Sequence, residues 1–115
     1  MTLLIFWNAP SADSRAVLLD LNRFCKRINC KKINIIGIVR DPADKAARFV
    51  KRKAIRFCQF YDPDEITREN YDIDTDEEPI FWLVDDGGKV RLRLNGYTEA
   101  NLHKIKKIYR QCLSV

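Results

Sequence analysis

The chain has 115 residues, enough for one domain whose hydrophobic core needs neither disulfides nor a metal to hold it together. Hydrophobic residues make up 46% and charged residues 32%, with four Gly and four Pro, a composition typical of a globular protein and not of a disordered one. No apolar run reaches the roughly 20 residues that span a bilayer, and no signal-peptide pattern opens the chain. A single domain over residues 1–115 without a membrane span is therefore predicted, and its compartment is left open.

The net charge of +5 is unevenly distributed along the chain. Residues 62–78 hold nine acidic residues and one basic residue, a net charge of −8, which leaves +13 on the rest. Basic residues gather in 26–32, in 40–56 and near the C-terminal end. No zinc-finger, helix-turn-helix or RNA-binding aromatic motif accompanies them, so solvated helix faces are favoured, an acidic partner surface is the second interpretation, and nucleic-acid binding is disfavoured.

The first elements along the chain are a buried strand and an amphipathic helix. Leu3 to Trp7 is a continuous apolar run, as expected for a strand covered on both faces. From Ala12 to Ile28 apolar residues recur every three or four positions, which defines one face of a helix. Ser11 is placed to cap this helix, and Asp13 lies near the positive end of its dipole.

The remaining elements continue the alternation and then change to a hairpin. A β-branched strand over 33–39 is followed by a helix from about Pro42 to Lys53, a short strand over 56–61, and a helical or turn segment over 63–71. Ile80 to Val84 and Lys89 to Leu94 form a hairpin around an Asp-Asp-Gly-Gly turn, and a last helix covers 101–113. The order βαβαβ–ββα predicts an α/β sandwich with helices on both faces of a mixed sheet.

Two distant motifs show a resemblance to the thioredoxin superfamily that covers nearly the whole chain. The segment 6–15, FWNAPSADSR, resembles the FWAxWCxxCR segment of that superfamily, and 78–90, EPIFWLVDDGGKV, resembles its cis-proline strand and DxxG turn. The segments IGIVRD (36–41) and YDP (61–63) are similar to the branch that contains thiol-specific antioxidant proteins and the thioredoxin-like reductants of cytochrome c maturation. The resemblance implies a thioredoxin fold, a three-layer α/β/α sandwich around a mixed sheet of four to five strands.

The resemblance places Ser11 and Ser14 at the positions of the two catalytic cysteines. In active relatives the first cysteine sits at a helix N-terminus, which favours the thiolate, and the second resolves the mixed disulfide. A serine hydroxyl is far less acidic and forms no disulfide, and the only histidine, His103, lies in the last helix. The chain as written is therefore predicted to be unable to perform dithiol chemistry.

The resemblance also implies a peptide-binding groove formed by Trp7, Pro10, Glu78 and Pro79. If the Glu78–Pro79 bond is cis, the backbone of Glu78 can pair with an extended peptide beside the Ser11 turn, and this pairing requires no sulfur. Glu78 stands where a small or uncharged residue is expected, and Pro10 stands where tryptophan is usual. A protein or peptide partner at this groove is the expected ligand.

The cysteines and acidic residues give no metal or cofactor signature. Cys25, Cys30, Cys58 and Cys112 contain no CxxC pair, which argues against structural zinc. Asp72 to Asp76 alternates like a calcium loop, but the required glycine and the bidentate glutamate are missing. Cys25 and Cys112 are predicted to be small buried hydrophobic residues, while Cys30 and Cys58 border strands, where exposure is an open alternative.

Two hypotheses explain the serine pair. In the first, natural loss of the dithiol has left a binding module; the departures at Pro10 and Glu78 favour it. In the second, the chain is a Cys-to-Ser form of an active thiol-disulfide oxidoreductase that reduces or exchanges protein disulfides. The isosteric exchange at both positions, with Arg15 and Pro79 retained, favours this second hypothesis.

Overall fold

The computed structural model describes residues 1–8, 10–28, 34–39, 43–61 and 79–113. In chain order the elements are β1 (Thr2–Trp7), α1 (Ala12–Ile28), β2 (Asn34–Val39), α2 (Ala43–Arg52), β3 (Cys58–Tyr61), β4 (Ile80–Val84), β5 (Val90–Asn95) and α4 (Glu99–Leu113). The predicted turn or helix over 63–71 lies outside the described residues. The other predicted elements are confirmed, most closely the helix from Ala12 to Ile28.

One five-stranded sheet of order β3-β2-β1-β4-β5 organises the structure. β1 pairs in parallel with β2 from Thr2 with Asn34 to Trp7 with Val39, and antiparallel with β4 as far as Phe6 with Ile80. β3 joins β2 in parallel, and β5 joins β4 antiparallel with a register shift at Leu83/Val84. The sheet is therefore mixed, as predicted, with β1 at its centre.

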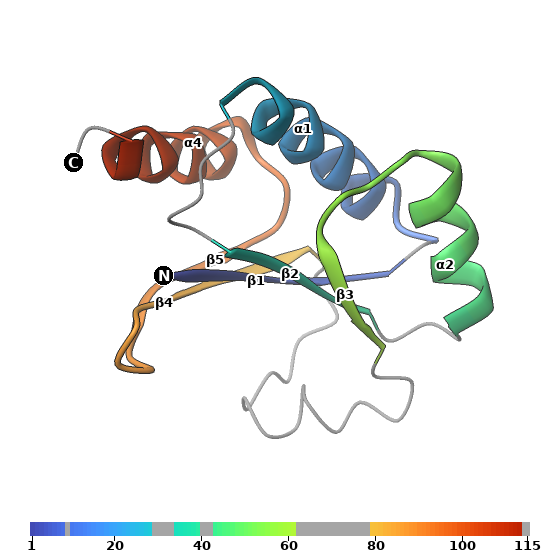
Figure 1. The fold of residues 1–115 in the computed structure, drawn as a ribbon, viewed down its shortest axis with the longest axis horizontal. Helices are drawn as coiled ribbons and strands as arrows, with labels where there is room; N and C mark the ends of the chain where they lie inside the picture. Colours follow the sequence, from blue (N-terminus) through green and yellow to red (C-terminus); the bar gives the residue numbers. More distant parts are fainter. Residues whose placement is uncertain (9, 29–33, 40–42, 62–78, 114–115) are drawn as a thin grey trace.

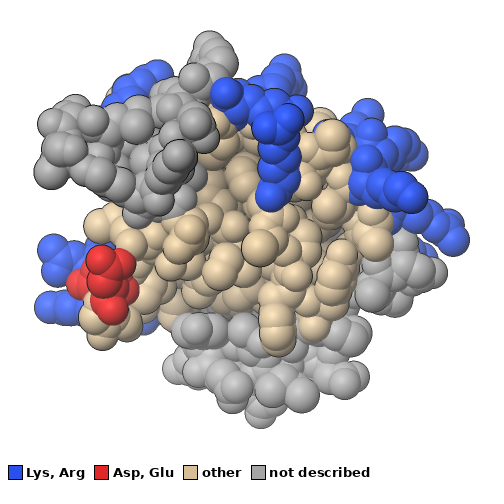
Figure 2. All heavy atoms as spheres, in the orientation of Figure 1, with Lys and Arg blue, Asp and Glu red and all other residues tan. Residues whose placement is uncertain are grey.

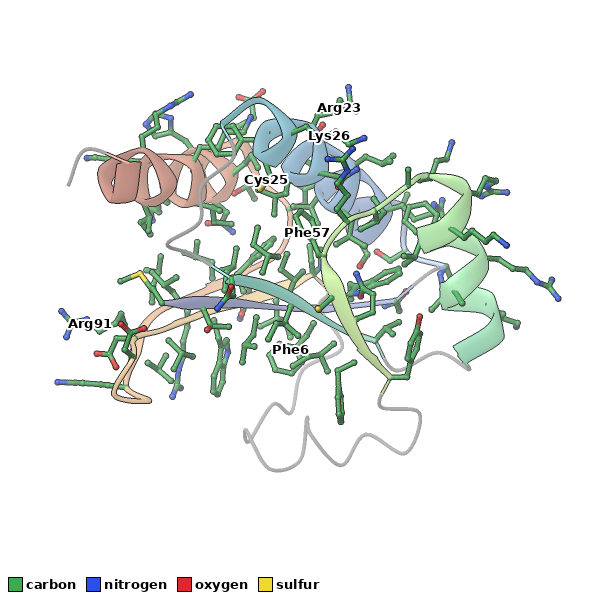
Figure 3. All side chains as sticks on the ribbon, in the orientation of Figure 1. Phe6, Arg23, Cys25, Lys26, Phe57 and Arg91 are labelled. Atoms are coloured by element: carbon green, nitrogen blue, oxygen red, sulfur yellow. The ribbon has the colours of Figure 1, made fainter. Side chains whose placement is uncertain are left out.

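The central strand is buried on both faces of the sheet, which is why its sequence is apolar without alternation. Leu3, Ile5 and Trp7 belong to the larger core, which also contains side chains of all three described helices. Leu4 and Phe6 belong to a second cluster built from strand residues on the opposite face. Figure 3 shows Phe6 projecting from the sheet on the side away from the helices.

The three described helices all pack against one face of the sheet (Figure 1). α1 contributes Val17, Leu18, Leu21 and Phe24, α2 contributes Ala46 and Phe49, and α4 contributes Ile105. The predicted α/β sandwich with a mixed sheet is confirmed. In the described part of the chain the helices cover one face of the sheet, so the predicted helices on the other face are not seen there.

Asn22 ties α1 to the connection between α2 and β3. Its side chain is buried, its amide nitrogen donates to the Ala54 carbonyl at 3.1 Å, and its amide oxygen accepts from the Arg56 N–H at 3.0 Å. Because the Arg56 N–H is used in this way, β3 begins at Cys58 and not at Arg56 as predicted. A local bond explains why α4 begins at Glu99, two residues earlier than predicted: the Thr98 hydroxyl accepts from the Asn101 N–H at 3.0 Å.

The C-terminus of α2 ends in a left-handed residue. The Ile55 N–H donates to the Val50 carbonyl at 3.0 Å and the Ala54 N–H to the Lys51 carbonyl at 3.2 Å, the two bonds of a Schellman motif. Ala54 has φ of 52°, a conformation that glycine adopts without the Cβ penalty.

Ala54→Gly is therefore expected to raise the free energy of unfolding by about 1 kcal/mol, because it removes the left-handed Cβ strain. Ala47→Gly is the matched control, since Ala47 is exposed inside the same helix and the change there costs about 1 kcal/mol. Urea denaturation measures both. A loss of stability in both variants would contradict the assigned helix end.

A second tie joins α1 to the segment between β5 and α4. The Tyr97 hydroxyl donates a hydrogen bond to the Asp20 carboxylate. This bond, followed by burial, raises the pKa of the Tyr97 hydroxyl from its ordinary 10.0 to about 12. Ionisation would set a phenolate beside a carboxylate, so the neutral phenol is favoured in the folded chain.

Between pH 10.0 and about 12 the folded chain holds a proton on Tyr97 that the unfolded chain has lost. The stabilisation from this bond is therefore complete below pH 10.0 and declines as the pH rises toward 12. Absorbance at 295 nm should show one tyrosine titrating late, and Tyr97→Phe should remove that step. If all tyrosines of the folded protein titrate together near pH 10, with the fold verified by circular dichroism, the Asp20 bond is absent in solution.

Candidate functional site

The candidate site is the turn that leads from the end of β1 into α1. It follows the central strand directly, at the sheet end where β1 has a parallel neighbour on one side and an antiparallel neighbour on the other. Such a position is a common location for ligand sites in open α/β sheets. The turn contains Asn8, Pro10, Ser11 and, one helical turn later, Ser14.

Ser11 is the N-cap of α1, as predicted. Its hydroxyl oxygen accepts from the Ser14 N–H at 3.2 Å, and its own N–H donates to the Asn8 side-chain oxygen at 2.9 Å. Asp13 in the first turn is exposed and complements the positive end of the helix dipole.

Ser14 is completely buried, with 0% of its surface exposed. Its hydroxyl oxygen accepts from the Asn8 N–H at 3.4 Å, so Asn8 contacts Ser11 with its side chain and Ser14 with its backbone. The hydrogen bonds of the two serines are therefore local, and within the described residues they involve neither a histidine nor a carboxylate. This pattern fits a structural cap and gives no activated nucleophile.

Trp7 supports the turn from the core. Its side chain is 0% exposed and packs against Phe49, with 5.8 Å between ring centroids. The indole N–H donates to the Gln59 side-chain oxygen at 2.9 Å. Gly37 on β2 makes room for this bond, because a Cβ there would lie 2.1 Å from the same oxygen.

The other predicted groove residues differ in exposure. Pro79 is buried one residue before Ile80, which pairs with Phe6, so it lies at the sheet end that carries the turn. Its carbonyl accepts from the Gly96 N–H at 2.8 Å. Pro10 is exposed, and its carbonyl accepts from the Arg15 guanidinium at 3.0 Å. Glu78, and with it the bond predicted to be cis, lies outside the described residues.

The structure brings Ser11 and Ser14 together and places Trp7 and Pro79 at the same end of the sheet. Trp7 and Pro79 are buried, so their side chains do not form an exposed groove wall. Asn8 and Gln59 were missed at the sequence level. Asn8 had a usable signal, an Asn three residues before a helix cap, where its side chain can bond to a following backbone N–H; Gln59 is distant in sequence and had none.

Other classes of site find no support in the described part of the chain. No group of three or more His, Cys, Asp or Glu side chains there could hold a metal ion. None of the helices in the described ranges is long and apolar enough to cross a bilayer. Cys58 is exposed on β3, and Cys25 is half-buried against the main core. The predictions for Cys30 and the Cys112 side chain fall outside the described residues.

The sheet order, the capped helix after the central strand and the proline before β4 are those of a thioredoxin-like fold. The model of the AhpC/TSA family matches residues 1–93, so the chain belongs to the AhpC/TSA family. The sequence-level resemblance to the thiol-specific antioxidant branch is thus confirmed. None of the curated proteins with which the sequence was compared matches it.

Solved structures support the fold at low sequence identity. A protein from Chlorobium tepidum described as a thiol:disulfide interchange protein DsbE has a TM-score of 0.83 at 21% identity, covering 97% of this chain and 79% of its own. The bacterioferritin comigratory protein of Xanthomonas campestris has a TM-score of 0.79 at 16% identity, with 96% and 78% covered. A thiol-disulfide oxidoreductase from Bacteroides fragilis has 0.73 at 24% identity, with 93% and 80% covered.

Loss of the cap should weaken α1 without affecting the core. Ser11→Ala is expected to lower the free energy of unfolding by about 1 kcal/mol, because the Ser14 N–H loses its acceptor. Ser11→Asp keeps an acceptor at the cap, so its free energy of unfolding should stay within a few tenths of a kcal/mol of that of the natural chain. Equal losses in the two variants, measured by urea denaturation, would show that the hydroxyl does not act as a cap.

Proposed function

We propose that this chain is a redox-inactive member of the AhpC/TSA family that binds an extended segment of a partner protein beside the Ser11 turn. The observation that carries the proposal is the hydrogen bonding of Ser11 and Ser14. Both hydroxyl oxygens accept from backbone N–H groups of the turn, at 3.2 and 3.4 Å, where thiols would react in an active relative. We also propose that residues 1–115 act as one domain.

Dithiol chemistry requires two sulfur atoms that can approach each other at the helix start. A serine hydroxyl is not appreciably ionised at neutral pH and cannot be oxidised to a disulfide. Cys25 lies 14 residues after Ser11 on the same helix, so at about 1.5 Å per residue it is roughly 21 Å away. Cys58 lies on β3, two strands from β1. Neither supports exchange at the turn.

Peptide binding at the turn would use the backbone. The resemblance gives the backbone of Glu78, beside Pro79, the role of pairing with an extended segment, and specificity would then come from the surrounding side chains. Pro10 offers an exposed apolar surface, and Arg15, held to the Pro10 carbonyl at 3.0 Å, offers a cation beside it. The binding would persist without the cysteines, because none of these contacts involves sulfur.

The second candidate is a Cys-to-Ser form of an active thiol-disulfide oxidoreductase. The intact helix start favours it: Ser11 caps α1, and Ser14 occupies the next turn as the resolving cysteine would. Under this hypothesis the natural substrate is a protein disulfide, and restoring both sulfurs should restore exchange.

Redox inactivity is tested by disulfide reduction with insulin as substrate and dithiothreitol as reductant. Three chains are compared: the natural chain, a chain with Cys25, Cys30, Cys58 and Cys112 all replaced by Ala, and that chain with Ser11→Cys and Ser14→Cys added. The natural chain is expected to reduce insulin at the same rate as the cysteine-free chain. A higher rate in the natural chain would overturn the assignment, because the native cysteines would then be catalytic.

The two candidates are separated by the potential of the restored pair and by peptide selection. A reversible disulfide between about −270 and −120 mV would favour the oxidoreductase form. Peptides displayed on phage are then selected on the natural chain and counter-selected on Pro10→Ala, an exposed change that should leave folding intact. Enrichment of peptides that need Pro10 supports the binding module. The absence of any enrichment would contradict it.

A further inference from the structure

A charged depression lies between α1 and α4, at the end of α1 opposite the Ser11 turn. It has a volume of about 420 Å³ and is lined by Asp20, Arg23, Phe24, Lys26 and Lys106. Asp20, the first lining residue, follows Ser11 by nine residues, so the depression begins roughly 14 Å along the helix from that turn. Figure 3 shows Arg23 and Lys26 on the side of α1 away from the sheet. It is therefore a surface distinct from the candidate site.

Cations from two helices converge on this depression. Lys106 and Arg110 of α4 lie over the Phe24 ring of α1, with the ammonium nitrogen 5.4 Å and the guanidinium carbon 5.6 Å from the ring centroid. Arg23 and Lys26 approach from α1 itself, and Arg23 has 74% of its side chain exposed. The cation–π contacts hold two positive groups near one ring, so these charges are partly ordered before any ligand binds.

The single carboxylate of the lining is already engaged. Asp20 accepts the hydrogen bond from Tyr97 and lies 3.4 Å from the Arg23 guanidinium. Within the described part of the chain, neither Lys26 nor Lys106 forms an ion pair. The lining therefore has an excess of positive charge that its own carboxylate does not balance.

We infer that the α1–α4 depression is a docking site for an acidic segment of a partner protein. Charge complementarity selects the occupant: carboxylates on an extended segment would meet Arg23, Lys26 and Lys106 from both walls at once. The volume falls within the range of clefts that accommodate ligands of several side-chain equivalents. The inference does not depend on the proposed function, since it concerns the other end of α1.

The surroundings favour a peptide over other polyanions. Single-stranded nucleic acid is usually held by exposed aromatic rings on which bases stack, but Phe24 is 1% exposed. A membrane-binding helix presents large apolar side chains to the lipid, yet among the described residues the exposed large hydrophobic side chain is Phe60, which lies on β3 and not on the helices. Figure 2 shows Lys and Arg over the helices and also at the β4–β5 hairpin.

The test measures binding of a fluorescein-labelled decaglutamate peptide by fluorescence anisotropy at low ionic strength. The double variant Lys26→Gln/Lys106→Gln removes two converging charges and should weaken binding about tenfold, or about 1.4 kcal/mol. The matched control is Lys45→Gln/Lys89→Gln, which removes the same charge at exposed positions on α2 and in the β4–β5 turn. The control should change binding less than twofold. Raising the salt concentration should weaken binding to the natural chain.

Equal weakening by the two double variants would overturn the inference, because binding would then follow net charge alone. A thymidine decanucleotide that binds more tightly than decaglutamate, with the same dependence on Lys26 and Lys106, would also overturn it in favour of nucleic acid. Association with phosphatidylserine vesicles that is tighter than binding of decaglutamate would overturn the inference in favour of a membrane surface. Circular dichroism verifies that each variant is folded. The exposed Arg23→Gln change serves as a second probe if Lys106→Gln disturbs packing over Phe24.

Discussion

The pairing of β1 with both of its neighbours is the constraint on which the rest of the structure depends. β1 is central in the sheet, and its side chains enter two separate hydrophobic clusters, one on each face. A one-residue slip would exchange Leu4 and Phe6 with Leu3, Ile5 and Trp7 and would destroy both clusters together. The position of the turn after Trp7 is therefore fixed by the register of the whole sheet, before any interaction within the turn is considered.

That constraint explains why the turn can keep its shape without sulfur. Trp7 is held by a hydrogen bond to Gln59 and by packing against Phe49. The helix starts where the Ser11 hydroxyl provides an acceptor. Asn8 then closes the turn by contacting both serines. The local polar groups are satisfied by one another, and among the described residues no buried side-chain nitrogen or oxygen lacks a partner. This turn uses both serine hydroxyl oxygens as acceptors for its own backbone N–H groups.

Sequence patterns predicted the elements well where one segment carries its own signal. The apolar run of β1, the helical period of α1 with its serine cap, and the glycine-containing turn before β5 each depend on neighbouring residues. The patterns failed where two distant segments meet. Asn22 takes the Arg56 N–H and shortens β3, and Trp7 reaches Gln59 across Gly37 on the strand between them. The burial of Trp7 and Pro79 also results from packing between distant segments. Their own sequence neighbourhoods do not reveal it, so they were predicted to form part of the groove.

The two ends of α1 present opposite electrostatic settings. The N-terminal end offers backbone N–H groups and the positive end of the helix dipole, and the Ser11 hydroxyl accepts from one of those donors, the Ser14 N–H. At the C-terminal end Lys26 complements the negative end of the dipole, so stabilisation of the helix explains part of the basic cluster. Arg110 likewise complements the C-terminal end of α4. The dipole does not explain why Lys106 shares the Phe24 ring with Arg110, since like charges repel each other. Binding of an external anion would reduce that repulsion. In its absence the cation–π contacts with Phe24 hold the charges in position.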